Sequence, residues 1–311
     1  MKTVNLFFSC DDTYLPFLAV TLTSIRENRD KSRRYVVRIL NTGLTPENRQ
    51  RLQTLAEENF LLEPVDISLT VERFARQLHT RDYYSQSTYY RLFIPELFPE
   101  LDKALYLDCD IVVTGDISRL FDRELGSDLV GAVPDSMVIA IKPLSQYARK
   151  RLQVRPENYF NAGVLLMNLE QMRKIRFTDT FLRLLQTVTF RVAQDQDYLN
   201  VLCKGRVTYL GFEWNTMPGS IRTDAPRLIH YNLDCKPWQR DDVAYSDVFW
   251  HYAKRSGFYQ DILAIRAGFT PERIRRRALQ TTDLIALGKR QSRQWTRNYL
   301  IQWQIKKAVN F

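Results

Sequence analysis

The first part of the chain alternates between short apolar segments and longer amphipathic ones, and this alternation limits the possible folds more than any other feature. Residues 4–8 are apolar enough for a buried strand, and residues 14–27 place one apolar face at helical spacing. A second strand is expected at residues 35–40, followed by a helix over residues 46–59 with Thr45 as N-cap and a proline in its first turn. Strand, helix, strand, helix in this order is typical of a parallel sheet covered on both faces.

The same alternation continues through the middle of the chain. With 311 residues, 45% of them hydrophobic, the chain can bury a large core. We expect one α/β domain with a mostly parallel central sheet over residues 1–257, followed by a helical basic extension over residues 258–311. Further strands are predicted at residues 61–67, 103–107, 129–133, 163–167, 207–210 and 228–231, and helices at residues 71–78, 87–97 (bending or ending near Pro95), 178–187 and 194–202.

The positive charge of the chain is concentrated at one end. The net charge is +10, but residues 270–311 hold ten basic and two acidic side chains, which leaves only +2 for the rest. A nucleic-acid-binding protein is expected to spread basic side chains over its folded face. We therefore expect no nucleic-acid partner for the body of the protein.

Cysteine spacing and hydropathy indicate a cytoplasmic protein. The cysteines show no C-x-x-C pair, which argues against a disulfide framework and a structural zinc site. The apolar run over residues 4–10 is too short for a secretory signal, and no uncharged stretch approaches the ~18 residues that a membrane span needs. The protein should be soluble, or peripheral on the membrane through its tail. The four cysteines are Cys10, Cys109, Cys203 and Cys235.

Two carboxylates follow the predicted strand at residues 103–107. Asp108 and Asp110 are separated by Cys109, so at strand spacing both carboxylates project to the same side. Open parallel sheets bind ligands at the carboxyl ends of their strands, where a divalent cation and its phosphate ligand would be expected. The alternative is an ordinary turn, since this tripeptide pattern is common.

The loop after the first strand is also acidic. If the strands are parallel, Asp11 lies at the same sheet edge as Asp108, and its carboxylate can accept hydrogen bonds from a nucleobase or ribose. The alternative is that Asp12 or Thr13 caps the following helix. The two roles are compatible.

A histidine and a lysine follow the strand predicted at residues 228–231. His230 is one of only three histidines, and Lys236 precedes a Pro-Trp pair that could hold it in place. Such a segment could supply a metal ligand and a cation for a phosphate, although a single histidine is often structural. Two aspartates with one histidine favour Mn²⁺, or Mg²⁺, held jointly by protein and diphosphate oxygens.

Two further stretches place polar groups where core residues are expected. Asn161-Ala162-Gly163 leads into an apolar strand, and Gln194-Asp195-Gln196-Asp197 opens a helix. Acidic residues at a helix start are favoured by the helix dipole, so capping is a strong alternative for Asp195 and Asp197.

Together these motifs resemble those of the family 8 glycosyltransferases, which are retaining, metal-dependent enzymes of the glycosyltransferase-A fold. The family includes bacterial lipooligosaccharide galactosyl- and glucosyltransferases. The resemblance covers residues 4–238 and keeps motif order and approximate spacing. It is carried by Asp11-Asp12, Asp108-Cys109-Asp110, Phe160-Asn161-Ala162-Gly163-Val164, Gln194-Asp195-Gln196-Asp197, and His230 with Lys236-Pro237-Trp238.

The resemblance implies a site for a UDP-sugar and a metal ion. One departure is Leu233, because many members have a glycine there that lets the backbone approach a phosphate. The implied metal ligands are Asp108, Asp110 and His230, with Lys236 on the diphosphate, Ser9, Cys10, Asp11, Thr13 and Cys109 around the uridine, Arg91 on the nucleotide sugar, and Asn161, Ala162, Asp195 and Gln196 around the hexose.

The function implied is transfer of glucose or galactose from a UDP-sugar to a saccharide or glycolipid acceptor, with retention of anomeric configuration, in the synthesis of lipopolysaccharide or another surface glycan. Gln196 would offer its amide oxygen to the developing positive charge, and a UDP phosphate oxygen would take the acceptor proton. Two alternatives are a sugar-phosphate nucleotidyltransferase, although the loop at residues 9–12 lacks the expected glycines, and a non-catalytic UDP-binding module with a lipid- or nucleic-acid-binding tail.

The tail itself has an amphipathic pattern. Trp295, Tyr299 and Trp303 recur every four residues, with Arg293 and Arg297 on the opposite side. The pattern suits a helix that lies on an anionic bilayer, and the alternative is a solvated surface helix. The resemblance extends to this tail, because the lipooligosaccharide enzymes have a similar membrane-associating segment.

Overall fold

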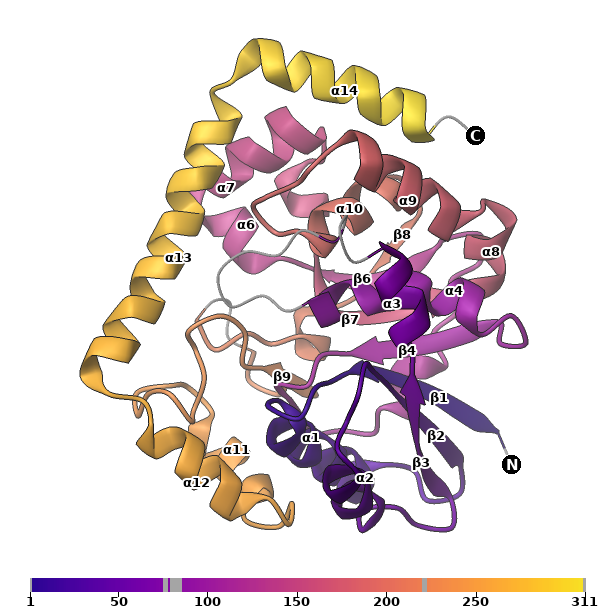
Figure 1. Ribbon diagram of the computed structural model, residues 1–311, viewed down its shortest axis with the longest axis vertical. Coiled ribbons are helices and arrows are strands. Elements are labelled where there is room, and N and C mark those ends of the chain that lie inside the picture. The colour runs from indigo at the N-terminus through magenta and orange to yellow at the C-terminus, as the bar shows by residue number, and fades with distance from the viewer. Residues whose placement is uncertain (1, 75–77, 79–85, 220–222, 310–311) are drawn as a thin grey trace. The chain divides into compact units, whose positions relative to one another are not determined.

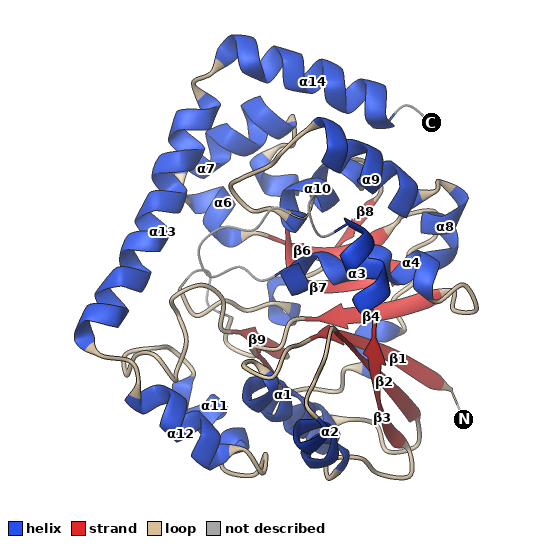
Figure 2. Cartoon of the chain, viewed as in Figure 1, coloured by secondary structure: helices blue, strands red, loops and turns tan. Residues whose placement is uncertain are grey.

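The computed structural model describes residues 2–74, 78, 86–219 and 223–309 (Figure 1). Seven strands form a mostly parallel sheet in the order β3-β2-β1-β4-β7-β6-β8, and two more form a separate small sheet, β5-β9. Helices flank the strands (Figure 2). The predicted α/β class is therefore confirmed. The chain divides into two compact units, each built from three segments.

The first unit comprises residues 1–69, 104–124 and 211–279. Its amino-terminal part confirms the predicted alternation, because β1 pairs in parallel with both β2 and β4, and β2 pairs in parallel with β3. Thr45 accepts a hydrogen bond from the Asn48 amide and so caps α2 as predicted. These elements are β1 Thr3–Ser9, α1 Leu15–Asn28, β2 Arg34–Asn41, α2 Pro46–Gln53, β3 Phe60–Asp66 and β4 Lys103–Leu107.

The rest of the first unit packs on α1. The ring of Trp238 is buried and stacks on Phe17 of α1 at 3.9 Å between centroids, within an apolar cluster that includes residues of β5, β9, α11 and α12. Strands β5 and β9 pair antiparallel, with Ile111 opposite His230. The elements are β5 Ile111–Val113, α5 Ser118–Phe121, η4 Phe212–Trp214, β9 Leu228–His230, α11 Ser246–Ala253 and α12 Tyr259–Ala267.

The second unit comprises residues 70–103, 125–210 and 280–311. In it, β6 pairs antiparallel with β7 and parallel with β8. Its elements include α3 Ser68–Phe74, η1 Gln86–Phe93, α4 Ile94–Leu97, β6 Val130–Pro134, α6 Ser136–Ala140, α7 Lys142–Tyr147, the π-helix η2 Ala148–Leu152, η3 Pro156–Asn158, β7 Phe160–Asn168, α8 Leu169–Lys174, α9 Phe177–Thr187, α10 Asp195–Leu202 and β8 Val207–Tyr209.

Four elements differ from the sequence prediction. The helix expected over residues 46–59 ends at Gln53 as α2. The helix expected at residues 87–97 is a 3₁₀-helix, η1, followed by the short α4, because Pro95 lies in the first turn of α4, where its missing N–H costs nothing. Strand β7 begins three residues before the predicted start, so Asn161 and Ala162 are strand residues. The helix expected at residues 71–78 is described only as far as Phe74, and residues 75–77 lie outside the described part of the chain.

The C-terminal extension forms two helices, α13 Pro271–Ser292 and α14 Trp295–Val309. From residue 280 onward it belongs to the second unit. One face of α14 is buried there, including Ile301 and Ile305, and Arg151 of η2 donates a hydrogen bond to Asn298 at 2.9 Å. The extension is therefore packed into this unit. The side chains of Trp295 and Arg297 lie outside the described residues.

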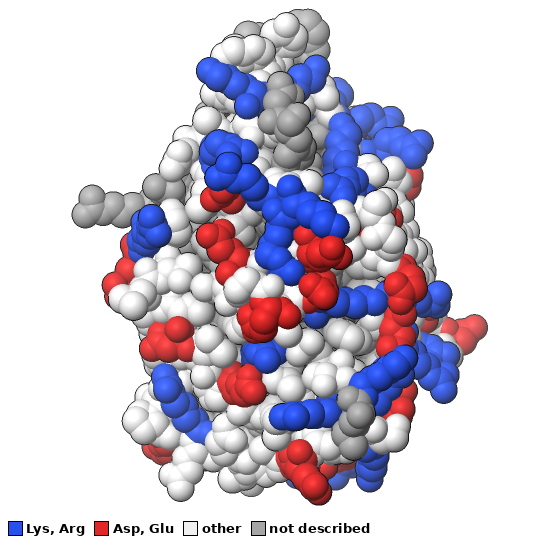
Figure 3. All heavy atoms as spheres, turned by 90° about the vertical axis from the view of Figure 1, so that its right-hand side faces the viewer, with Lys and Arg blue, Asp and Glu red and all other residues white. Residues whose placement is uncertain are grey.

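On the face drawn in Figure 3, acidic side chains lie between the basic ones. Among the described helices, none has both the length and the apolar character that a membrane crossing requires.

Candidate functional site

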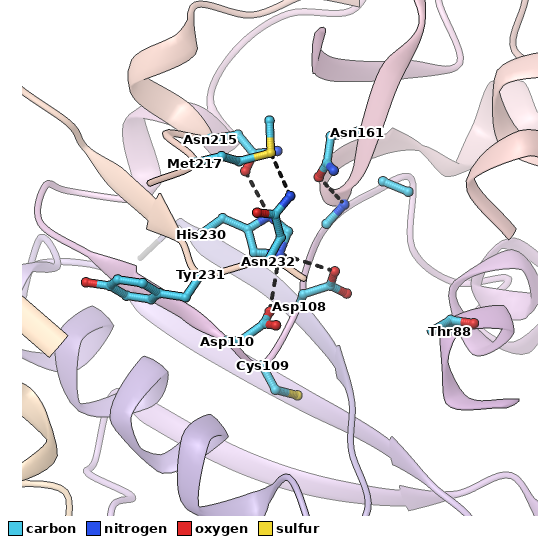
Figure 4. A network of polar contacts seen from close by, with 12 residues as sticks. Thr88, Asp108, Cys109, Asp110, Asn161, Asn215, Met217, His230, Tyr231 and Asn232 are labelled. Atoms are coloured by element: carbon cyan, nitrogen blue, oxygen red, sulfur yellow. Dashed lines mark hydrogen bonds and ion pairs between the residues drawn. The ribbon is translucent and has the colours of Figure 1, made fainter. Parts of the chain in front are cut away.

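Asp108, Asp110 and His230 form a cluster in the first unit (Figure 4). The aspartates follow β4, and the antiparallel pairing of β5 with β9 places His230 beside Asp110. The His230 Nε2 atom is 3.2 Å from Asp110 Oδ1 and 3.7 Å from Asp108 Oδ2. One ligand atom from each residue lies within 4.8 Å of those of the other two. The structure thus brings together the three residues expected to bind a metal.

The orientation of the His230 ring is fixed by Asn215. His230 is buried, and its Nδ1 atom is 3.0 Å from Asn215 Oδ1. A carboxamide oxygen only accepts hydrogen bonds, so Nδ1 carries a proton, and Nε2, which faces the aspartates, is the ring nitrogen that could bind a cation. Hydrogen bonding of the second ring nitrogen is typical of metal-binding histidines. Sequence reasoning missed Asn215, because only the tertiary fold brings it to His230.

Lys236 completes the charge balance of this cluster. Its ammonium donates hydrogen bonds to Asp110 Oδ2 and, at 2.9 Å, to the Tyr231 carbonyl. Although burial alone would raise the pKa of Asp110, Lys236 and His230 hold that pKa well below its usual range. Asp110 is therefore ionised, with one oxygen facing His230 and the other facing Lys236.

These residues fit a divalent cation. Two carboxylates and one imidazole nitrogen converge on one point, and carboxylate-rich sites suit Mg²⁺ and Mn²⁺. Cys109, between the aspartates, is buried and donates to the Ser9 carbonyl, so its side chain lies away from the cluster. The alternation predicted for the Asp-Cys-Asp segment is confirmed by this arrangement.

The loop after β1 has a different capping pattern from the one predicted. Asp11, not Asp12 or Thr13, accepts a hydrogen bond from the Tyr14 amide (2.9 Å) before α1. Asp12 accepts instead from Asn48 of α2 at 2.7 Å. Thr13 is exposed and lies in the turn before α1.

Ser9 ends β1 and Cys10 follows it, both with buried side chains. Cys10 Sγ contacts the Asp11 carbonyl at 3.2 Å. The Ser9 hydroxyl has no hydrogen-bond partner among the residues that the structure describes. A buried hydroxyl without a partner costs free energy, and a bound ligand at this position would remove that cost.

Leu233 adopts the backbone conformation of a glycine. Its φ angle is +51°, in the left-handed region where a side chain is strained. The loop between His230 and Lys236 thus keeps a glycine-like turn although it contains a leucine.

A second cluster lies in the second unit, around Ala162 of β7. Arg91 of η1 is buried, lies 3.3 Å from Asp195 of α10, and donates to the Ala162 carbonyl. Asp195 therefore forms an ion pair with Arg91, and a helix cap would not need this partner. Three of the residues expected around the nucleotide sugar are brought together here.

Gln196 has a defined carboxamide orientation in this second cluster. Its oxygen accepts from the Ala162 amide at 2.9 Å, and its nitrogen donates to Asp135 at 3.1 Å and to the Tyr159 hydroxyl at 3.3 Å. The backbone donor and the carboxylate acceptor together exclude the flipped amide. The Gln196 side chain is half-buried.

Asn161 is held by the same carboxylate. Its side-chain nitrogen donates to Asp135 at 3.2 Å, and its oxygen accepts from the Gly163 amide at 3.0 Å. Asp135 also caps α6 through the amides of Met137 and Val138. Sequence reasoning missed Asp135, although an aspartate directly after a strand and before a helix was a usable signal.

Comparison with known proteins gives a consistent result. The family described as "Glycosyl transferase family 8" matches residues 5–242. Lipopolysaccharide 1,2-glucosyltransferase of Escherichia coli (strain K12) is 28% identical over 286 residues, covering 84% of this chain and 80% of that protein.

Two solved structures are similar in fold and sequence. The galactosyltransferase LgtC, solved with donor and acceptor sugar analogues, aligns with a TM-score of 0.70 and 28% identity over 81% of this chain and 96% of that chain. The bifunctional glycosyltransferase WbbM aligns with a TM-score of 0.71 and 30% identity, and this chain covers 85% of its own length but only 52% of that chain.

Proposed function

Because the chain belongs to glycosyl transferase family 8, we propose that it transfers a hexose, glucose or galactose, from a UDP-sugar to a saccharide acceptor with retention of anomeric configuration. The observation that carries the proposal is the convergence of Asp108, Asp110 and His230 beside β4. Carboxylates and an imidazole so placed can hold a cation that also binds a diphosphate.

In the proposed site, Asp108, Asp110 and His230 hold Mn²⁺, or Mg²⁺. When bound, the ion supplies positive charge that stabilises the departing UDP. Lys236, already next to Asp110, adds a second positive charge for the diphosphate. The uridine and diphosphate positions are assigned to the loop after β1, to Cys109 and to the glycine-like turn at Leu233. The residues of that loop are Ser9, Cys10, Asp11 and Thr13.

The hexose is assigned to the second cluster. Asp195 accepts from sugar hydroxyls while its charge is balanced by Arg91, and Asn161 and Ala162 contact the same ring. One lone pair of the Gln196 oxygen accepts from the Ala162 amide, and the second lone pair is assigned to the developing positive charge. Because an amide is a poor nucleophile, we assign proton removal from the acceptor to a UDP phosphate oxygen on the same face of the sugar.

The acceptor is proposed to be a lipopolysaccharide or another surface glycan. Support comes from the E. coli relative, which is named a lipopolysaccharide glucosyltransferase. Residues 1–257 carry every proposed site residue, and the extension over residues 258–311 would hold the enzyme at the cytoplasmic face of an anionic membrane. On α14, Tyr299, Leu300 and Trp303 are more than half exposed.

The test is a panel of UDP-sugars with Mn²⁺, scored for slow hydrolysis without acceptor. We expect UDP-glucose or UDP-galactose to be hydrolysed, and the released sugar to keep its anomeric configuration by NMR. Hydrolysis of no UDP-sugar, with UDP still bound, would point to a binding module instead. Pyrophosphate release from UTP and a sugar 1-phosphate would point to a nucleotidyltransferase.

A further inference from the structure

A buried carboxylate lies behind Gln196 in the second unit. Asp197 has no exposed surface and accepts hydrogen bonds from three donors. These are the Tyr159 hydroxyl at 2.7 Å, the Tyr147 hydroxyl at 2.8 Å and the Ala193 amide at 3.0 Å. The side chain of Asp197 therefore lies in the interior, where it can act on a substrate only through another residue.

Tyr159 is the tyrosine of this pair that is hydrogen-bonded to Gln196. Its hydroxyl oxygen lies 3.3 Å from Gln196 Nε2. Burial and the nearby Asp197 raise the pKa of Tyr159 well above its usual value, so the hydroxyl keeps its proton. That single proton is donated to Asp197, which leaves the hydroxyl oxygen as an acceptor for Gln196.

We propose that Tyr159 is a positioning residue that fixes the carboxamide of Gln196, and that Asp197 sets the direction of the Tyr159 hydroxyl. Asp135 and Tyr159 both accept from the Gln196 nitrogen, so the Gln196 oxygen is turned to the Ala162 amide and to the position assigned to the hexose. This inference rests on the proposed function, in which Gln196 faces the reacting sugar.

The chain offers a matched pair of variants. Tyr159→Phe and Tyr147→Phe each remove one hydrogen bond to Asp197 from a fully buried ring, and both should lower the melting temperature by a similar amount. Only Tyr159→Phe removes an acceptor for Gln196. We expect it to lower kcat for UDP-hexose hydrolysis about fivefold to tenfold with KM for the UDP-sugar nearly unchanged. Tyr147→Phe should keep kcat within about twofold.

A spectroscopic measurement separates this inference from the proposed function. In protein labelled with ¹⁵N-glutamine, the Gln196 side-chain amide resonances are identified by their loss in Gln196→Ala. They should shift in Tyr159→Phe and stay in place in Tyr147→Phe. Asp197→Asn should also shift them, because the new amide can donate to Tyr159 and turn its hydroxyl toward Gln196.

Each outcome decides the inference. Equal kcat in the two phenylalanine variants, or Gln196 resonances that move equally in both, would show that Tyr159 is only a structural partner of Asp197. If the wild-type protein hydrolysed no UDP-hexose, the proposed function would fail, and the resonance comparison would still decide whether Tyr159 positions Gln196.

Discussion

His230 stands opposite Ile111 in the antiparallel pair of β5 and β9, and this register places its ring 3.2 Å from Asp110. The next backbone bond, from the Tyr231 amide to the Asp110 carbonyl at 2.9 Å, continues the pairing past the strand ends. Two segments more than one hundred residues apart in sequence are thus fixed by backbone hydrogen bonds, and the cluster does not depend on flexible loops alone.

Replacing Asp110 should weaken UDP binding as strongly as removing the metal. Asp110→Ala removes a carboxylate that contacts both His230 and Lys236. Calorimetry of UDP binding with Mn²⁺ should therefore show the loss of affinity that EDTA causes in the wild-type protein. Equal UDP affinity with Mn²⁺ and with EDTA would contradict the metal assignment.

Asn215 should matter for metal binding although it does not belong to the proposed ligand set. Asn215→Ala frees the Nδ1 atom of His230, so the ring can turn and change tautomer. Loss of such a partner typically weakens metal binding ~10-fold or more. A Mn²⁺ titration followed by UDP binding would measure the change, with an unchanged melting temperature as the control for folding. Wild-type Mn²⁺ affinity in this variant would show that the hydrogen bond is dispensable.

The left-handed backbone at Leu233 predicts an unusual order of stability. At most positions alanine is more stable than glycine, but at φ +51° an L side chain costs roughly 1 kcal/mol. Leu233→Gly should therefore be more stable to urea than Leu233→Ala by about 1 kcal/mol. Both variants lose the leucine side chain, so their difference isolates the backbone conformation. The reverse order would show that the turn is not left-handed in solution.

The sequence predicted one cluster better than the other, for a physical reason. Asp108 and Asp110 directly follow β4, and the structure brings both carboxylates to one side, as strand spacing predicted. Helix capping was a strong alternative for Asp197, but its carboxylate accepts from Tyr147 and Tyr159, which come from other elements. Such packing depends on the assembled core and leaves no local pattern.

The C-terminal extension also shows which features a local pattern can predict and which it cannot. The helical character of the extension was predicted from its periodicity. Which face of α14 would pack was not, because Asn298 and Gln302 look like solvent residues in sequence yet are buried against Arg151 of η2.

Asp197 predicts a measurable pH dependence of stability. Burial outweighs its hydrogen bonds and raises its pKa from 3.8 to about 6 in the folded state. Between these values the folded state holds a proton that the unfolded chain has lost, so the contribution of Asp197 is greatest below about pH 4 and is lost as the pH rises through about 6. The shift corresponds to roughly 3 kcal/mol. The titratable neighbours of Asp197 are Tyr89, Tyr147, Arg151, Tyr159 and Tyr198.

The measurement compares wild type with Asp197→Asn by urea unfolding at pH 4 and at pH 7. The difference in free energy of unfolding, wild type minus variant, should decrease by roughly 2.4 kcal/mol between pH 4 and pH 7, since asparagine does not titrate. The five neighbours stay in one ionisation state between these pH values and so cancel in the difference. A difference that is constant with pH would mean that Asp197 is ionised throughout.

The two faces of α14 make the membrane hypothesis testable without unfolding the protein. Removing all residues after Pro271 would take Ile301 and Ile305 out of the second unit, so such a truncation would confuse loss of anchoring with loss of stability. The triple variant Tyr299→Ser, Leu300→Ser, Trp303→Ser changes only side chains that are 55% to 72% exposed. It should keep the melting temperature and the hydrolysis of UDP-sugar, but lose most sedimentation with anionic vesicles, because interfacial helices bind through buried apolar area and through basic side chains.

Lys306→Gln with Lys307→Gln is the matched variant for charge, and its loss of sedimentation should be greater at low salt than at high salt. Undiminished sedimentation of the triple variant would exclude α14 as the anchor.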